Sequence, residues 1–348
     1  SGTLLIIQGA GNRLENYATV TNTAGTFTVD GGLGIGLINH PGATITNSGG
    51  SFIVQNGTNQ RVDNYGTITN SATFTVNGAS AGMGLINRAN ALITNNAGTF
   101  SVQFGTDRRV DNYGTITNAA TFSIDGASTG EGLINRTNAS ITNNGGSFTV
   151  ASGNAVRVDN YSTITNAATF TIGGAGSGQG LINRTGAKVL NNAGTFTVQS
   201  GSTTLVENDG KIENSGTFTI QSTGGSETLV NRDTVINKAG ATFTVEYSAG
   251  RILKNSKYVS NSGTMNLRNA IFNLPIPELV INELGAVLLN NNGAVLYMGN
   301  TFAPRIFTNH GSFQNNGRAT LQASNGLGLF NSNTGTVNVQ DSLGINAL

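Results

Sequence analysis

A repeat of 48 residues constrains this chain more than any other feature of its sequence. The phrase Arg-Val-Asp-Asn-Tyr at 61–65 returns at 109–113 and 157–161, and Gly-Leu-Ile-Asn-Arg at 84–88 returns at 132–136. The two phrases alternate along the chain, and each contains an Asn two residues after an apolar residue. The basic unit is therefore a coil of alternately 23 and 25 residues. A period of this size predicts one stacked repeat architecture rather than separate globular domains.

One Asn marks each coil at the end of its first phrase. Identical amides stacked one coil apart can hydrogen-bond to each other and satisfy backbone groups at a corner. We therefore interpret this uniform column as a structural ladder rather than as ligand groups. Its regular members are Asn16, Asn39, Asn64, Asn87, Asn112, Asn135, Asn160, Asn183, Asn208 and Asn231.

Two further phrases follow in each coil, Thr-Ile-Thr-Asn as at 67–70 and Thr-Phe-Thr-Val as at 73–76. Both alternate Thr with β-branched or aromatic residues, which predicts short strands with Ile, Phe and Val inward and Thr outward. No helical period occurs. We expect aromatic faces to stack along a core column made of Phe27, Phe52, Phe74, Phe100, Phe122, Phe148, Phe170, Phe196, Phe218 and Phe243.

The predicted fold is therefore all-β: a single parallel β-solenoid of about 14 coils of about 24 residues, with three short strands per coil. Residues 1–267 should form the regular solenoid with its 48-residue double repeat, and residues 268–348 should continue it as less regular coils. Pro275 and Pro277 cannot donate ladder hydrogen bonds, so their segment is expected to be a bulged coil or an excursion that offers a specific contact.

Composition excludes several classes of function. The chain of 348 residues has no Cys, two His, 10% charged residues and a net charge of +1. A thiolate or multi-His metal centre is therefore not expected, nor is a cofactor. The basic excess that nucleic acids require is missing. No apolar run is long enough to span a membrane.

One column of carboxylates raises the question of catalysis, as in solenoid polysaccharide lyases and hydrolases. Its members recur in every second coil, and most follow an Arg by two residues, as Asp63 follows Arg61. A catalytic site would be expected at a position where one coil differs from the others, whereas these carboxylates recur regularly as part of the repeat. We favour solvated ion pairing and expect no catalytic residues. The column contains Glu15, Asp63, Asp111, Asp159 and Glu207.

The residue directly after the ladder Asn of each coil is mostly aromatic in one coil and cationic in the next. Stacked coils would turn this alternation into a cation–π ladder along one edge. Stabilisation of that edge is the favoured interpretation, and a stripe that binds carbohydrate or a partner is the alternative. The stripe contains Tyr65, Arg88, Tyr113, Arg136, Tyr161 and Arg184.

Outward Thr-x-Thr pairs, such as Thr73 with Thr75 and Thr195 with Thr197, are similar to the Thr arrays of ice-binding β-solenoids. Thr is also a favoured polar residue on any exposed strand. A comparable array on the second strands weakens the ice-binding hypothesis, because a dedicated ice face would normally be single.

The two ends of the chain align with the middle of a coil. Leu4 and Ile6 match a third strand, Val337 and Val339 are predicted to form another, and Ile345 is placed at the start of a further first strand. Uncovered solenoid ends expose unpaired backbone groups and an open core. We expect head-to-tail stacking of copies into a filament, unless these ends lie within a longer rod.

The phrases Gly-Thr-Ile-Thr-Asn at 66–70 and Gly-Thr-Phe-Thr-Val at 194–198 resemble those of bacterial surface β-solenoid proteins, such as autotransporter passengers and filamentous-haemagglutinin-like adhesins. The resemblance implies an extracellular or cell-surface location and a mechanical or adhesive role. The leading hypothesis is a non-enzymatic subunit of a fibre, with copies of itself as partners and surface glycans as a further partner class. The alternatives are the monomeric shaft of an adhesin, an ice-binding protein and a polysaccharide lyase or hydrolase.

Overall fold

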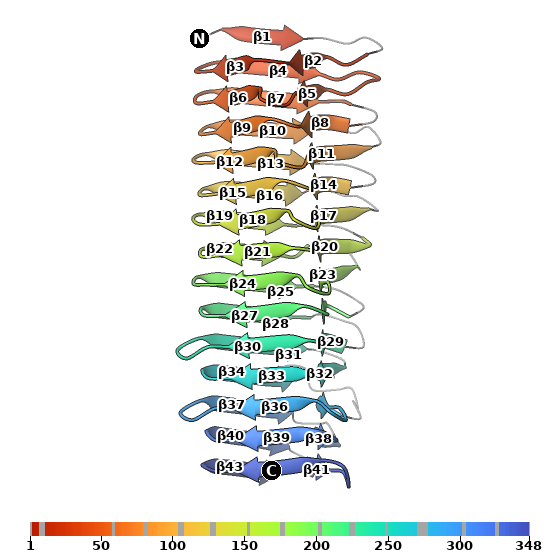
Figure 1. Ribbon diagram of the computed structural model, residues 1–348, viewed down its shortest axis with the longest axis vertical. Helices are drawn as coiled ribbons and strands as arrows, with labels where there is room; N and C mark the ends of the chain where they lie inside the picture. Colours follow the sequence, from red (N-terminus) through yellow and green to blue (C-terminus); the bar gives the residue numbers. More distant parts are fainter. Residues whose placement is uncertain are drawn as a thin grey trace. The chain divides into compact units, whose positions relative to one another are not determined.

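The computed structural model describes residues 2–6, 11–57, 60–78, 82–103, 108–125, 130–151, 154–174, 178–200, 204–222, 227–247, 250–269, 278–300, 304–323 and 327–347. The chain forms two compact units, Ser1–Gly176 and Ser177–Leu348, here called the N-terminal and C-terminal units. All regular elements of the described residues are β-strands (Figure 1). The segment around Pro275 and Pro277 lies outside the described residues.

In the N-terminal unit, each coil contributes one strand to each of three parallel sheets. The first strands are β2 (Leu14–Asn16), β5 (Leu37–Asn39), β8 (Gln60–Asn64), β11 (Met83–Asn87), β14 (Arg108–Asn112), β17 (Glu131–Asn135) and β20 (Val156–Asn160). The second strands are β3 (Thr19–Asn22), β6 (Thr44–Asn47), β9 (Thr67–Asn70), β12 (Leu92–Asn95), β15 (Thr115–Asn118), β18 (Ser140–Asn143) and β21 (Thr163–Asn166). The third strands are β1 (Thr3–Ile6), β4 (Thr26–Asp30), β7 (Ser51–Gln55), β10 (Thr73–Asn77), β13 (Thr99–Gln103), β16 (Thr121–Asp125), β19 (Ser147–Val150) and β22 (Thr169–Ile172).

The C-terminal unit repeats the same scheme of three parallel sheets. Its first strands are β23 (Gln179–Asn183), β26 (Val206–Asn208), β29 (Glu227–Asn231), β32 (Arg251–Asn255), β35 (Val280–Asn282), β38 (Arg305–Asn309) and β41 (Leu327–Asn331). Its second strands are β24 (Lys188–Asn191), β27 (Lys211–Asn214), β30 (Thr234–Asn237), β33 (Tyr258–Asn261), β36 (Val287–Asn290), β39 (Ser312–Asn315) and β42 (Thr336–Val339). Its third strands are β25 (Thr195–Gln199), β28 (Thr217–Gln221), β31 (Thr242–Tyr247), β34 (Thr264–Asn269), β37 (Val295–Asn300), β40 (Arg318–Ala323) and β43 (Ser342–Ala347).

The predicted fold class is confirmed, because the chain is an all-β parallel β-solenoid with three strands in each coil of about 24 residues. Alternation along each strand produces this architecture. Ile68, Phe74 and Val76 are fully buried, whereas Thr67 and Thr69 are half-buried on the outer side. The interior of the solenoid is therefore filled by one apolar set per coil.

The Phe column stacks face to face within each unit. Phe74 lies 4.8 Å from Phe52 and 4.7 Å from Phe100 between ring centroids, with the planes within 6° of parallel. In-register pairing of the third strands forces this arrangement, since Phe52, Phe74 and Phe100 are direct neighbours across the sheet. The prediction of stacked aromatic faces is confirmed at these positions.

Two Asn ladders mark the corners after the first and second strands. The Asn64 side-chain amide donates to Oδ1 of Asn87 at 2.9 Å, and Asn70 donates to Asn95 at 2.8 Å. These amides are fully buried and also donate to backbone carbonyls, as Asn64 does to Gly66 at 3.2 Å. The predicted ladder is therefore confirmed, and the second column satisfies its corner in the same way.

The last strands differ from the predicted assignment. Val337 pairs with Phe313 of β39, so Val337 and Val339 lie on a second strand and not on a third. Ile345 pairs with Leu321 of β40, which places it on a third strand and not on a first. The prediction failed because Val339 occupies the position of the ladder residue Asn315, so the marker of the second strand is missing there.

The boundary predicted at residue 267 describes the regularity of the sequence and stays a prediction. The division into two compact units falls at a different point of the sequence, after residue 176. Third strands continue on both sides of residue 267, because β31 pairs with β34 and β34 with β37 in register. The less regular sequence of the last coils is therefore compatible with the same strand order.

Candidate functional site

A ladder of aromatic and cationic side chains follows the corner at which the first strands end. The guanidinium carbon of Arg88 lies 5.2 Å from the ring centroid of Tyr65, and that of Arg136 lies 5.3 Å from the ring centroid of Tyr113. These distances are within cation–π range. The predicted cation–π ladder is thus present at both pairs. A role of the stripe in binding stays a prediction.

The carboxylate column holds the same guanidinium groups. Arg88 donates from Nε and Nη2 to the two carboxylate oxygens of Asp63 at 2.6 and 3.0 Å, and Arg136 binds Asp111 in the same way at 2.7 and 3.0 Å. Hydrogen bonds to Asp63 raise the pKa of Arg88, against the opposing effect of its partial burial. Such bidentate pairs fix the orientation of both groups.

The predicted solvated pair of Arg61 with Asp63 is wrong. Asp63 is only 4% exposed, and the Arg61 side chain is fully buried. Arg61 donates from Nη2 to the carbonyl oxygen of Gly78 at 2.7 Å, which ties its strand to the segment after β10. Burial lowers the pKa of the Arg61 guanidinium. Sequence spacing alone did not reveal that the bidentate partner of Asp63 comes from the next coil.

Buried Arg residues alternate with Gly at one position of the first strands, an alternation that the spacing of the repeated phrases did not lead us to predict. Arg61 and Arg109 are fully buried. Gly84 occupies the same position in the coil between them, where an added Cβ would lie 2.6 Å from the Arg109 carbonyl oxygen and 2.8 Å from Cγ1 of Val102. The largest buried side chain thus alternates with the residue that lacks one, which explains why the repeat spans two coils.

The first two coils carry a variant of the aromatic and cationic ladder. The rings of Tyr17 and His40 are stacked, with centroids 3.8 Å apart and planes within 9°. Glu15 accepts a hydrogen bond from the Tyr17 hydroxyl at 2.9 Å and lies 3.2 Å from Nε2 of His40. A stacked aromatic ring with a carboxylate beside it therefore takes the place of the guanidinium pair.

The geometry of the ladder favours edge stabilisation over carbohydrate binding. A sugar ring stacks on an aromatic face, but Arg88 covers one face of Tyr65 and interacts electrostatically with both Tyr65 and Tyr113. Tyr65 is 38% exposed. Tyr161 is the last Tyr of this series in the N-terminal unit, and Arg184 is the first Arg of the series in the C-terminal unit.

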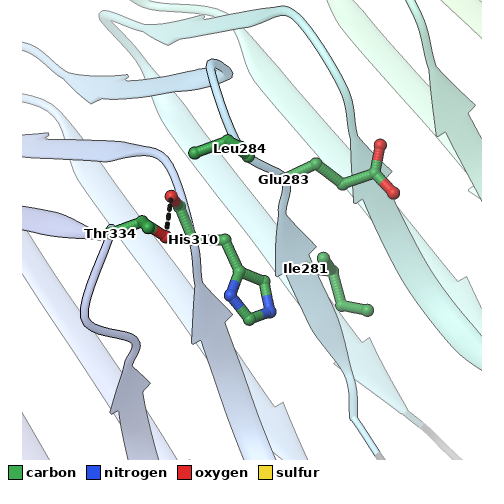
Figure 2. A pocket seen from close by; sticks show the side chains of 5 residues that line it. All are labelled: Ile281, Glu283, Leu284, His310 and Thr334. Atoms are coloured by element: carbon green, nitrogen blue, oxygen red, sulfur yellow. Dashed lines mark hydrogen bonds between the residues drawn. The ribbon is translucent and has the colours of Figure 1, made fainter.

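A hollow of about 510 Å³ lies beside the C-terminal ends of the first strands β35 and β38, where the sequence repeat is less regular (Figure 2). Its lining comprises Ile281, Glu283, Leu284, His310 and Thr334. Figure 2 shows the Glu283 carboxylate and the His310 ring pointing in different directions. The Thr334 hydroxyl donates to the His310 backbone carbonyl at 3.2 Å, so it belongs to the turn. The polar groups therefore do not converge on a common point.

Glu283 is already engaged outside the hollow. Its carboxylate lies 3.1 Å from Nζ of Lys254 and accepts a hydrogen bond from Ser256. Burial opposes ionisation of Glu283, but the contacts with Ser256 and Lys254 outweigh it and lower the pKa. Within the described ranges, no group of three or more His, Cys, Asp or Glu side chains could hold a metal ion.

No protein-family model matches the chain, and no curated protein or solved structure shows significant similarity to it. Of what the resemblance to bacterial surface solenoids implies, the structure shows the parallel β-solenoid fold, and membership of that group stays a prediction. In the part of the chain that the structure describes, no helix has the length and apolar character needed to cross a membrane.

Proposed function

We propose that this chain is an extracellular, non-enzymatic structural protein whose solenoid coils stack end to end on those of further copies and build a fibre. The observation that carries the proposal is the exposure of apolar side chains on edge strands. Leu4 on β1 and Ile345 on β43 continue the inward-facing columns of Phe27 and Leu321, and they are 52% and 50% exposed. Large exposed apolar groups on a strand are typical of surfaces that become covered.

The edge strands also offer main-chain pairing. Among the described residues, β1 pairs with β4 and β43 pairs with β40, each along one side. No described strand pairs with their other edges, and an edge of this kind can serve as a template for another parallel strand. A contact between two different ends does not close on itself, so repeated stacking yields a filament.

Strand order sets a condition on this stacking. Both β1 and β43 are third strands of a coil. If β2 of one copy pairs with β41 of another and β3 pairs with β42, then β1 and β43 occupy the same place in the third-strand sheet. One of the two strands must leave before all three sheets can continue. Removal of β43 should therefore favour assembly.

Negative-stain electron microscopy and light scattering of the full chain and of a chain truncated after Gln340 test the proposal. We expect fibres from both chains, with assembly of the truncated chain at lower protein concentration. Leu4 pairs with Phe27, which is half-buried and stacks on the core residue Phe52, whereas Leu5 pairs with Thr28 on the outer face. Leu4→Lys should abolish fibres by placing a charge in the junction core, and the matched control Leu5→Lys should preserve them. Dispersed particles from both chains would contradict the proposal and favour a monomeric adhesin shaft.

A further inference from the structure

The outer face of the second-strand sheet in the N-terminal unit carries two columns of hydroxyl side chains. One column is Thr in every coil: Thr21, Thr46, Thr69, Thr94, Thr117, Thr142 and Thr165. The other is hydroxylated in all coils except one: Thr19, Thr44, Thr67, Leu92, Thr115, Ser140 and Thr163. We call these two columns the Thr face. Strand pairing places their members directly beside one another from coil to coil.

The Thr face has no charged side chain, whereas two third strands of the same unit, β4 and β16, end in Asp30 and Asp125. In the C-terminal unit the equivalent columns carry Lys188, Lys211 and Glu213, and Lys211 pairs with Glu213. The first-strand sheet carries Asp63, which binds Arg88. A neutral, regular face among charged ones favours a ligand that is itself neutral and periodic.

The third-strand face of the same unit is less regular. Ile53 and Ser101 interrupt the column that contains Thr75, and Ser101 is buried. The unbroken Thr column of the second strands has no such interruption. The sequence could not separate the two Thr arrays, and the outward environment of each sheet distinguishes them.

β-Sheet geometry converts the Thr face into a two-dimensional grid. Neighbouring strands lie about 4.8 Å apart, and alternate residues of one strand lie about 6.6 Å apart. Thr is stiff at χ1 because it is β-branched. The Thr19 and Thr44 hydroxyl oxygens lie 3.1 Å apart, and the Ser140 hydroxyl donates to Thr115 at 3.2 Å. The face therefore presents ordered methyl and hydroxyl groups with a fixed spacing.

We infer that the Thr face binds the surface of ice crystals. A hydroxyl can both donate and accept a hydrogen bond, as a lattice of water molecules requires. The methyl groups make the face amphipathic, so a layer of ordered water can form over it. The absence of charge disfavours an ionic ligand, and the absence of aromatic side chains disfavours stacking on a sugar. This inference does not depend on end-to-end assembly.

Thermal hysteresis and partition of the labelled full chain into a growing ice front test the inference. We expect the wild-type chain to halt ice growth within a measurable hysteresis gap and to be enriched in the ice fraction. Thr117→Lys should abolish both effects, and a charged residue should be tolerated structurally because Glu213 occupies the equivalent position of β27 in the same sheet. The matched control Thr149→Lys on third strand β19 should retain both effects.

Circular dichroism and a melting curve verify the fold of each variant. If Thr117→Lys does not fold, Thr117→Val replaces it, because Val keeps the β-branched shape and removes the hydroxyl. A wild-type chain that neither halts ice growth nor enters ice would overturn the inference. Equal activity of folded Thr117→Lys and Thr149→Lys would overturn the assignment to this face. Repeating the measurement with Leu4→Lys separates ice binding from assembly, since that variant should lose fibres and keep its ice activity.

Discussion

At the scale of single residues, the buried amides do more than link one coil to the next. Asn112 accepts a hydrogen bond from Asn87 at 2.8 Å and donates to Asn135 at 2.9 Å. Its amide also donates to the Ser140 carbonyl, and its oxygen accepts from the Gly114 N–H at 3.3 Å. A single side chain thus satisfies backbone groups of its own coil and the following one.

Asn112→Ala should strongly destabilise the chain. The change leaves several buried polar groups without a partner, and each such group costs about 1–3 kcal/mol. We expect a loss of at least about 3 kcal/mol in the free energy of unfolding, measured by urea denaturation. Asn331→Ala is the matched control, because Asn331 ends the ladder and is exposed. An equal loss from both changes would contradict a role of burial.

At the scale of strands and coils, ion pairs connect neighbouring coils on the outer face. In the second-strand sheet of the C-terminal unit, the Glu213 carboxylate contacts Nζ of both Lys211 and Lys238. Hydrogen bonds to Lys211 and then Lys238 lower the pKa of Glu213. Because the folded state prefers the ionised form, these contacts stabilise the fold above the pKa that Glu213 has in the unfolded chain. The contribution is lost as the pH falls through the folded pKa.

Glu213→Gln should therefore lower the urea midpoint of the wild-type chain near pH 7 and have little effect in acid. The difference between the two proteins should shrink as the pH falls below about 4, where Glu213 becomes protonated. Urea titrations from pH 7 to pH 3 measure this difference. Asp341→Asn provides a control at an exposed carboxylate for which no ion pair is found among the described residues. A pH-independent difference at Glu213 would argue against the ion pairs.

At the scale of the whole molecule, stability should be a sum over coils and their neighbours, as in other solenoids. Both units contain stacked residues of the Phe column. Phe122 stacks between Phe100 and Phe148 at 4.8 and 4.7 Å in the N-terminal unit. Phe218 stacks between Phe196 and Phe243 at 4.8 and 5.0 Å in the C-terminal unit. Local damage should consequently affect mainly the unit that contains it.

Phe122→Ala should cost about 3–5 kcal/mol locally, because it leaves a cavity in the core. Hydrogen exchange read by mass spectrometry should then accelerate in residues 1–176 and change little in residues 177–348. Phe218→Ala is the reciprocal control and should show the opposite pattern. Uniform acceleration throughout the chain after either change would instead indicate one cooperative folding unit.

Much of the fold was accessible from the periodic sequence, because a fixed repeat imposes strand type, register and an inward or outward direction on every residue of a coil. Alternation predicted Phe74 and Ile68 in the core, and the recurring Asn predicted the ladders. Near the last strands the marker residue changes to Val339, and there the strand assignment failed. Periodicity predicts a structure only where its marker residues persist.

The repeated phrases were sufficient for the class of fold and for the core and ladder columns, since these follow from spacing along the chain. Contacts between coils depend on which side chains meet across a gap of 23 to 25 residues, and spacing alone misassigned them at Asp63. Its partner is Arg88 of the next coil, and Arg61 is buried instead. The reason why the repeat spans two coils likewise became clear only when the structure placed Gly84 and Arg109 on adjacent strands. Three-dimensional packing decides these pairings because burial and direct contact across coils select the partner.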